Sequence, residues 1–168
     1  MAVVTLKAKA ATNRDASPKV LSDSAYVKAG MKGFIGAVTA GAADSIASKY
    51  IMGSIPSNAI VHSVGLNCGA ITSAAADIGL YKKTDDAGVA GAVVDADFFI
   101  AATSIATAIT TNKEVANGNV ITLINSEKKV WELLGLSVDP NLVYDVVCTL
   151  TAAATASAAV QLKVQYGE

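Results

Sequence analysis

The sequence is poor in the residue types that carry chemistry. Its 168 residues include one histidine, two cysteines and one tryptophan, and aromatic residues make up only 5%. Two cysteines and one histidine cannot complete a structural zinc site without carboxylates. A Ser-His-Asp arrangement would need His62, but no G-x-S-x-G nucleophile elbow is present. Gly30, Gly33 and Gly36 are not set in a βαβ unit and so do not form a dinucleotide fingerprint. We therefore expect no enzymatic activity and no cofactor.

Charge and long apolar runs are also scarce. Charged residues make up 16% of the chain and the net charge is -1, which gives no basic surface for nucleic acid or for an anionic membrane. The longest charge-free apolar run, residues 98–109, is about half the roughly 20 residues that span a bilayer. The first residues lack the continuous apolar region of a signal peptide. We expect neither a nucleic-acid partner nor a membrane partner.

Several acidic residues are close in sequence and are therefore candidate ligands of a cation. Asp77, Asp85, Asp86, Asp95 and Asp97 could converge on calcium, but the D-x-D-x-D-G pattern of a calcium loop is absent. We interpret Asp85 and Asp86 as a solvated loop tip and Asp95 or Asp97 as the start of a helix. No metal site is predicted.

The pattern that dominates the chain is strand alternation interrupted by turns. Pro56 lacks a backbone donor and should end a strand, and Ser57 and Asn58 complete the turn. Extended segments are predicted at residues 32–39, 45–55, 60–68, 77–82, 93–94, 120–124, 144–150 and 158–166. This spacing predicts an all-β, mainly antiparallel fold, a jelly roll or β-sandwich of about eight strands with one or two short helices.

The two helices are expected at residues 98–109 and 126–135. Apolar residues recur at helical spacing in the first, although Thr103, Ile105 and Thr107 would also suit a strand. In the second, Ser126 is the expected N-cap and Gly135 follows the end. Its Trp131 is expected in the core, with a partner contact as the alternative.

Three further expectations concern the strands. The segments 144–150 and 158–166 are predicted to pair as an antiparallel hairpin. His62 is interpreted as a hydrogen-bonded histidine at the edge of the core. Cys68 and Cys148 fall on apolar strand positions, so two buried thiols are expected, with a disulfide between neighbouring strands as the alternative.

The domain organisation is predicted to be one β-sandwich, residues 31–168, preceded by an arm or edge segment, residues 1–30. This first segment has no sustained period of 2 or 3.6 and contains Pro18. A plain flexible terminus and an arm that docks on a neighbouring subunit are both compatible with it.

Five segments together resemble a family of small proteins encoded near the major capsid protein of tailed bacteriophages. They are Ile55-Pro-Ser-Asn-Ala-Ile60, Asp77-Ile-Gly-Leu-Tyr81, Val94-Asp-Ala-Asp-Phe-Phe99, Val130-Trp-Glu-Leu-Leu-Gly-Leu136 with Asp139-Pro140, and Tyr144-Asp145 leading into Leu150-Thr-Ala-Ala-Ala154. The resemblance rests on their joint order and spacing over residues 45–166, since none of them is a catalytic motif.

The resemblance implies a jelly-roll capsid decoration, or cement, protein. Such a protein is made in the host bacterial cytoplasm and binds the virion exterior, where it stabilises contacts between capsomers of the major capsid protein. It is expected to be a homo-oligomer, a dimer or a trimer. The alternatives are a receptor- or glycan-binding sandwich on the virion and a structural component of the head–tail junction or baseplate.

The residues predicted to bind a partner follow from expected exposure. They are Lys82, at the end of the predicted strand 77–82, and Lys83, Asp85 and Asp86 in the polar loop at residues 83–91. The N-terminal arm and the small-residue loops at residues 69–75 and 151–157 are further candidate contact regions.

Overall fold

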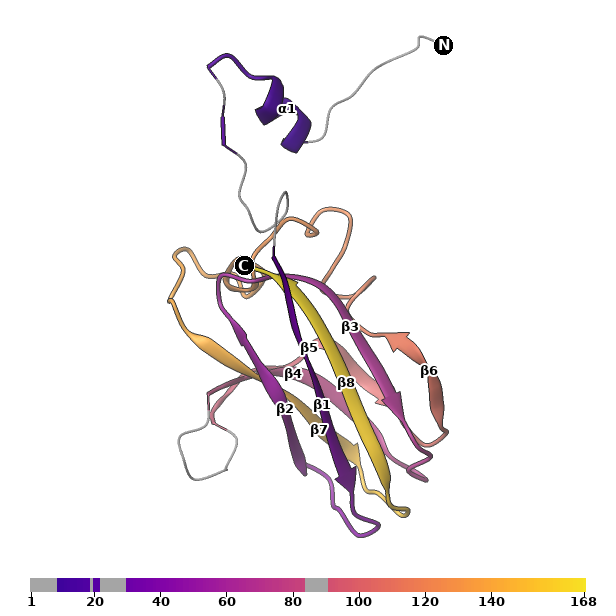
Figure 1. Cartoon of the computed structure of the whole chain (residues 1–168). Coiled ribbons are helices and arrows are strands. Elements are labelled where there is room, and N and C mark those ends of the chain that lie inside the picture. The colour runs from indigo at the N-terminus through magenta and orange to yellow at the C-terminus, as the bar shows by residue number, and fades with distance from the viewer. Residues whose placement is uncertain (1–8, 19, 22–29, 84–90) are drawn as a thin grey trace, which may run out of the picture.

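The fold was obtained as a computed structural model, which describes residues 9–18, 20–21, 30–83 and 91–168. Two short helices and eight strands lie within them (Figure 1). Their bounds are α1 Lys9–Asp15, β1 Met31–Ala40, β2 Lys49–Pro56, β3 Ile60–Cys68, β4 Ala75–Lys82, β5 Val93–Ser104, β6 Ile109–Glu114, α3 Val130–Leu133, β7 Val143–Ala152 and β8 Ala158–Gly167.

The strands form two four-stranded sheets, ordered β1-β8-β3-β6 and β2-β7-β4-β5. We call these the 1-8-3-6 sheet and the 2-7-4-5 sheet. All pairs within them are antiparallel, and β1 pairs with β8, β2 with β7, β3 with β6 and β4 with β5. This nested pairing is what results when one long hairpin is rolled up on itself, and it defines a jelly roll. The predicted fold class is therefore confirmed.

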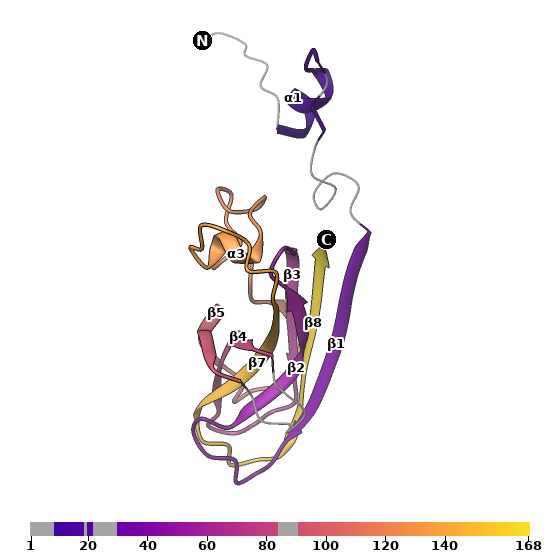
Figure 2. The same ribbon diagram turned by 90° about the vertical axis from the view of Figure 1, so that its left-hand side faces the viewer.

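The core fills the space between the two sheets, which Figure 2 shows nearly edge-on. Alternate residues of each strand point inward. The 1-8-3-6 sheet contributes Val64, Leu66, Val160, Leu162 and Val164, and the 2-7-4-5 sheet contributes Ile78, Leu80, Val146, Cys148 and Leu150. All ten side chains are buried, so apolar surface removed from water holds the two layers together.

The predicted hairpin between the last two strands is wrong. Both strands form where expected, but β7 belongs to the 2-7-4-5 sheet and β8 to the 1-8-3-6 sheet. The five residues between them, 153–157, cross from one sheet to the other. Two strands with alternating apolar residues can pair edge to edge in one sheet, or they can pack face to face from two sheets. The alternation alone does not distinguish these arrangements.

The predicted helix at residues 98–109 is also wrong, because most of this segment is β5. The pairing of β4 with β5 jumps from Leu80 opposite Asp95 to Ile78 opposite Ile100, so β5 carries a large bulge there. Phe98 and Phe99 are adjacent and both buried, with their rings 4.9 Å apart edge to face. A bulge interrupts the two-residue alternation of a strand. The apolar residues of this segment therefore recur at a spacing that resembles the spacing of a helix.

Residues 120–124 were predicted as a strand but form turns. The expected turn at Asn117-Gly118-Asn119 is present, with Gly118 at a φ of 83°. The backbone N–H groups of Asn119 and Ile121 both donate to the carbonyl of Ala116, which folds the chain back locally. This chain reversal leaves the β-branched residues that follow without a partner strand.

Helix α3 is shorter than predicted, and its N-cap is Lys129 rather than Ser126. Its end is as predicted: Gly135 has a φ of 73°, its N–H donates to the Glu132 carbonyl, and the Leu136 N–H donates to the Trp131 carbonyl. These two bonds form a Schellman motif. Trp131 is only half-buried, whereas Val130 is fully buried, so placing the tryptophan in the core was incorrect.

The N-terminal segment contains α1, a helix that the sequence pattern did not predict. Figures 1 and 2 both place α1 away from the two sheets. The division of the chain into an arm and a sandwich stays a prediction.

Candidate interaction surfaces

His62 lies at a bulge in β3, not within a catalytic arrangement. The pairing with β8 jumps from Val61 opposite Tyr166 to Ser63 opposite Gln165, which leaves His62 as the extra residue. Its Nε2 atom is buried and has no hydrogen-bond partner, so the interpretation as a hydrogen-bonded histidine is wrong. The bulge also shifts by one residue which side chains of β3 point inward. For this reason Val61 lies in the core together with Val64 and Leu66.

The two cysteines are free and buried, as predicted. Burial raises the pKa of the Cys68 thiol and raises the pKa of Cys148 to about 12. Because the thiolate is the reactive form, neither side chain is prepared to act as a nucleophile.

The acidic residues considered as a cation site have separate roles where the structure describes them. The Asp77 carboxylate accepts a 2.6 Å hydrogen bond from the Ala102 N–H and so ties β4 to β5. Burial and the neighbouring Asp97 raise the pKa of Asp95. Asp95 and Asp97 belong to the β5 strand and do not begin a helix. Among the described residues no three His, Cys, Asp or Glu side chains come together.

The partner-binding prediction is covered only in part by the structure. Lys82 and Lys83 are both exposed at the end of β4. Asp85 and Asp86 lie outside the described residues. The assignment of these four residues to a partner contact therefore stays a prediction.

An apolar groove of about 360 Å³, here called the α3 groove, lies beside Lys82. Lys82 and Asp95 are its two charged lining residues, and the other lining residues are Val94, Leu133, Leu134, Leu136, Leu142 and Tyr144. Leu136 and Leu142 keep 42% and 47% of their surface exposed, so the groove is open to solvent.

Ser57 holds the wall of the α3 groove in place. Its hydroxyl donates to the Asp139 carboxylate at 2.5 Å and accepts from the Leu142 N–H at 3.1 Å. The Ser57 carbonyl accepts from the Trp131 N–H at 3.0 Å, which fixes the start of α3. The hydrogen bonds from Ser57 and from the Asn141 N–H lower the pKa of Asp139. One turn residue after β2 thus anchors both sides of the segment 130–142.

The loop between β6 and α3, residues 115–129, carries two exposed aliphatic side chains near its middle. Leu123 is 100% exposed and Ile124 is 87% exposed. We call this pair the 123–124 tip. Sequence reasoning missed it because both residues were assigned to a strand. The signal that could have exposed the error was the pair of flanking turns, Asn117-Gly118-Asn119 before the tip and the polar run that begins at Asn125.

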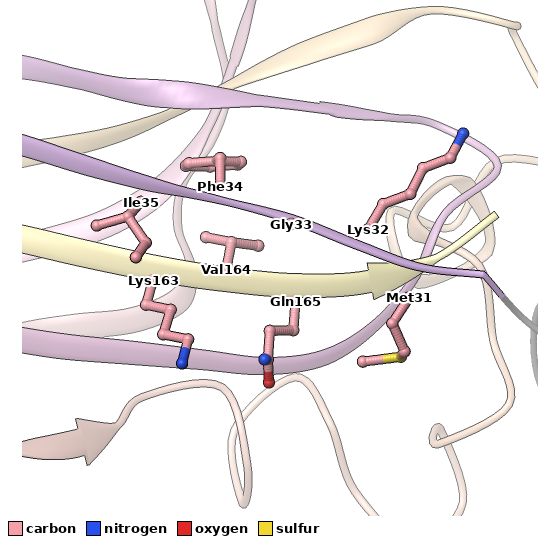
Figure 3. Close-up of a pocket in the computed structure, with 8 residues that line it drawn as sticks. All are labelled: Met31, Lys32, Gly33, Phe34, Ile35, Lys163, Val164 and Gln165. Atoms are coloured by element: carbon pink, nitrogen blue, oxygen red, sulfur yellow. The ribbon is translucent and has the colours of Figure 1, made fainter.

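The outer face of the 1-8-3-6 sheet is weakly charged. A pocket of about 420 Å³ lies along β1 and β8. Figure 3 shows Met31, Ile35, Lys163 and Gln165 pointing to one side of this strand pair and Phe34 pointing to the other. Among the outward-facing paired residues of β1, β8 and β3, Lys163 is the one charged side chain. Most of the others are amides, hydroxyls, alanines and glycines.

The small-residue loops named as contact regions are hydrogen-bonded to each other. The Thr155 N–H and hydroxyl both donate to the Thr72 carbonyl, at 3.1 and 2.9 Å. The Ser157 hydroxyl donates to the Ala40 carbonyl at 2.7 Å. The loops at residues 69–74 and 153–157 are therefore joined, and they lie at the end of the sandwich opposite to α3 (Figure 2).

The described residues include no helix with the length and hydropathy needed to cross a bilayer. No protein-family model matches the chain, and no curated protein matches it either.

Two solved structures contain chains with a similar fold. One belongs to the capsid asymmetric unit of cyanophage Pam1: its TM-score is 0.58 at 17% identity, and the match covers 91% of this chain and 96% of that one. The other belongs to the capsid of Ralstonia phage GP4, with a TM-score of 0.57 at 14% identity over 83% of this chain and 86% of that one. At these identities the likeness shows a shared fold.

Proposed function

We propose that this chain is a structural protein of a phage virion that binds the outer surface of the capsid and stabilises contacts between capsomers. The observation that carries the proposal is the fold match over nearly the whole length of this chain and of a chain in the Pam1 capsid. The resemblance of five ordered sequence segments to capsid decoration proteins is a second and separate support.

The mechanism is mechanical. A protein that binds the assembled shell but not its separated subunits shifts the equilibrium toward the shell by mass action. Each bound copy adds contacts across a seam, and all of these must break before the capsomers separate. The partner is the major capsid protein.

The surfaces of the molecule suit such a contact. Protein interfaces are depleted of charged residues at their centres, and Lys163 is the one charged side chain among the outward-facing paired residues of β1, β8 and β3. The proposed contact regions are the N-terminal arm, residues 1–30, the loop that follows Lys82 and Lys83, and the joined loops at residues 69–74 and 153–157.

Co-sedimentation with empty capsids of the same phage tests the proposal. The expected result is saturable binding at micromolar concentration, with a fixed number of copies per shell. Replacing both Lys82 and Lys83 with Glu should weaken binding, whereas Lys128→Glu, a charge reversal at an exposed position outside the proposed contact regions, serves as the matched control.

Absence of binding at micromolar concentration would contradict the proposal. Binding on a glycan array in place of capsid binding would favour a receptor-binding module. Binding to the isolated head–tail complex alone would favour a component of that junction.

A further inference from the structure

We propose that Asn117 is a site of spontaneous chemical modification, at which its side chain closes onto the backbone nitrogen of Gly118 and loses ammonia. Among the asparagines of the chain, Asn117 is the one that precedes a glycine. Glycine has no Cβ, so nothing on the residue itself shields its backbone nitrogen from the preceding side chain. The modification is independent of the capsid contact proposed above.

The turn that carries this pair is open to solvent. Asn117, Gly118 and Asn119 are all exposed. A Cβ added to Gly118 would meet no heavy atom within 4 Å, so there is room on that side for water and for the moving side chain. The φ of Gly118 is 83°, a conformation that glycine adopts without strain. The reacting groups and the water that the reaction consumes therefore have access to each other.

The Asn117 side chain is not tied down, in contrast to neighbouring asparagines. Within the described ranges its backbone N–H donates to the Glu114 carboxylate at 3.4 Å, and no hydrogen bond involves its side-chain amide. The Asn119 side chain instead donates to the Val115 carbonyl at 2.9 Å. A side chain held in that way must first break its hydrogen bond, whereas Asn117 can turn toward the next nitrogen by rotation about its own bonds.

One hydrogen bond restrains the attacking nitrogen. The Gly118 N–H donates to the Ile121 carbonyl at 2.8 Å, so this bond must open before the nitrogen can react. Hydrogen bonds in exposed turns open at a much smaller cost in free energy than those of core strands. We therefore expect the folded chain to react at a rate within about tenfold of that of the unfolded chain.

The reaction consumes water and releases ammonia, and no group is oxidised or reduced. The Gly118 nitrogen gives up its proton to solvent and attacks Cγ of Asn117. The new C–N bond closes a succinimide ring, and the amide group leaves as ammonia after taking a proton from solvent. Water then opens the ring. Attack at Cγ gives aspartate, and attack at the backbone carbonyl gives isoaspartate, whose main chain runs through Cβ and Cγ.

Both products change the loop at residues 115–129. The new carboxylate forms beside Glu114, whose own carboxylate already accepts the N–H groups of Val64 at 2.9 Å and Ala116 at 3.1 Å. Two carboxylates at one place repel each other. Isoaspartate also lengthens the main chain within the turn that the Asn119 and Ile121 N–H groups close on the Ala116 carbonyl. The surface of this loop therefore changes as the protein ages.

Peptide mapping by mass spectrometry tests this inference on the full-length folded chain, incubated at mildly alkaline pH and sampled over time. The same chain unfolded in guanidinium chloride is the reference. The peptide that contains Asn117 should gain the mass difference between an amide and an acid in both samples, at rates within about tenfold of each other. An isoaspartyl methyltransferase should label that peptide, while the other asparagines of the folded chain stay intact.

Asn117→Gln is the matched variant, because its longer side chain would have to close a larger and less favourable ring. It should abolish the labelling, and circular dichroism checks that the folded samples keep their strand content throughout. A folded chain that retains Asn117 while the unfolded chain is fully converted would overturn the inference, because the turn would then protect the pair. Earlier modification of another asparagine in the folded chain, or labelling that persists in Asn117→Gln, would overturn it as well.

Discussion

Glycine at positions 36 and 53 lets the two sheets meet along one side of the sandwich. A Cβ on Gly36 would overlap the backbone of Met52, and one on Gly53 would overlap the ring of Phe34. Strands β1 and β2 are edge strands of different sheets, so no ladder of hydrogen bonds joins them. Close backbone approach takes the place of a ladder there, and it requires residues without a side chain.

Gly36→Ala should therefore lower the free energy of unfolding by about 2–3 kcal/mol, because the methyl group meets backbone atoms that cannot turn aside. Chemical denaturation with a linear extrapolation measures the change. Gly30→Ala is the control: nothing lies within 4 Å of the added carbon, and the expected change is within about 0.5 kcal/mol. Equal stabilities of the two variants would contradict the proposed role of Gly36.

Ser57 is the second residue on which the structure depends. Its buried hydroxyl lies between a carboxylate and a backbone N–H. Ser57→Ala should cost about 1–3 kcal/mol, because the Leu142 N–H loses its acceptor inside the protein. Ser137→Ala, an exposed change in the same segment, should cost less than about 0.5 kcal/mol.

The same substitution has a signature in the titration of Asp139. Hydrogen bonds hold the pKa of Asp139 below its ordinary value of 3.8 in the folded chain. Its contribution to stability is then present above that value and is lost as the pH falls through the lower, folded-state pKa. Titration followed by NMR should show this pKa rising toward the ordinary value in Ser57→Ala. An unchanged pKa would mean that Ser57 does not stabilise the carboxylate.

At the scale of the element, the bulge in β5 brings two carboxyl groups together. The Asp97 N–H donates to the Asp95 carboxylate at 3.4 Å, and burial together with Asp97 raises the pKa of Asp95 above 3.8. A carboxyl group whose pKa is raised by folding favours the folded state while it is protonated. That contribution is present below the unfolded-state value and is lost as the pH rises through the folded-state pKa.

Asp95→Asn should therefore raise the melting temperature at pH 7 and change it much less at pH 3, where the wild-type carboxyl group is already neutral. Thermal unfolding at the two pH values measures the difference. Glu127→Gln removes the same charge from an exposed loop and should have little effect at either pH. A stabilisation that is equal at pH 3 and pH 7 would contradict this interpretation of Asp95.

The sequence predicts individual elements of this fold better than it predicts their partners. The strand that ends at Pro56, the turn at Ser57 and the alternation of β7 and β8 are all visible in it. The pairing of β7 with β2 and β4, and of β8 with β1 and β3, is not visible, because alternation marks which face is buried and not which edge is joined.

Bulges caused two further errors. His62 in β3 and the residues after Asp95 in β5 shift the register, and each shift reverses which residues face the core. Local sequence contains no direct signal for such a shift, since it depends on the strand opposite. The 123–124 tip was missed for a related reason: Leu and Ile favour strands when a partner strand exists, and here there is none.

At the scale of the whole molecule, the nested antiparallel pairs give every strand from β1 to β8 a partner that is distant in sequence or across a sheet. The first strand pairs with the last, so the sandwich is complete only when the final residues are in place. The weakly charged composition that was visible in the sequence becomes a weakly charged outer face in the structure. What the sequence could not provide is the position of the α3 groove, because its walls come from β4, β5, β7, α3 and the segment after α3.

The central claim of the proposed function is that the bound protein strengthens the capsid shell. The most direct measurement is the temperature at which empty, expanded capsids rupture, recorded by light scattering with increasing amounts of the protein and with an unrelated protein as control. We predict a rupture temperature that rises with protein concentration and levels off when the binding sites are full. An unchanged rupture temperature at a concentration that saturates binding would contradict the claim.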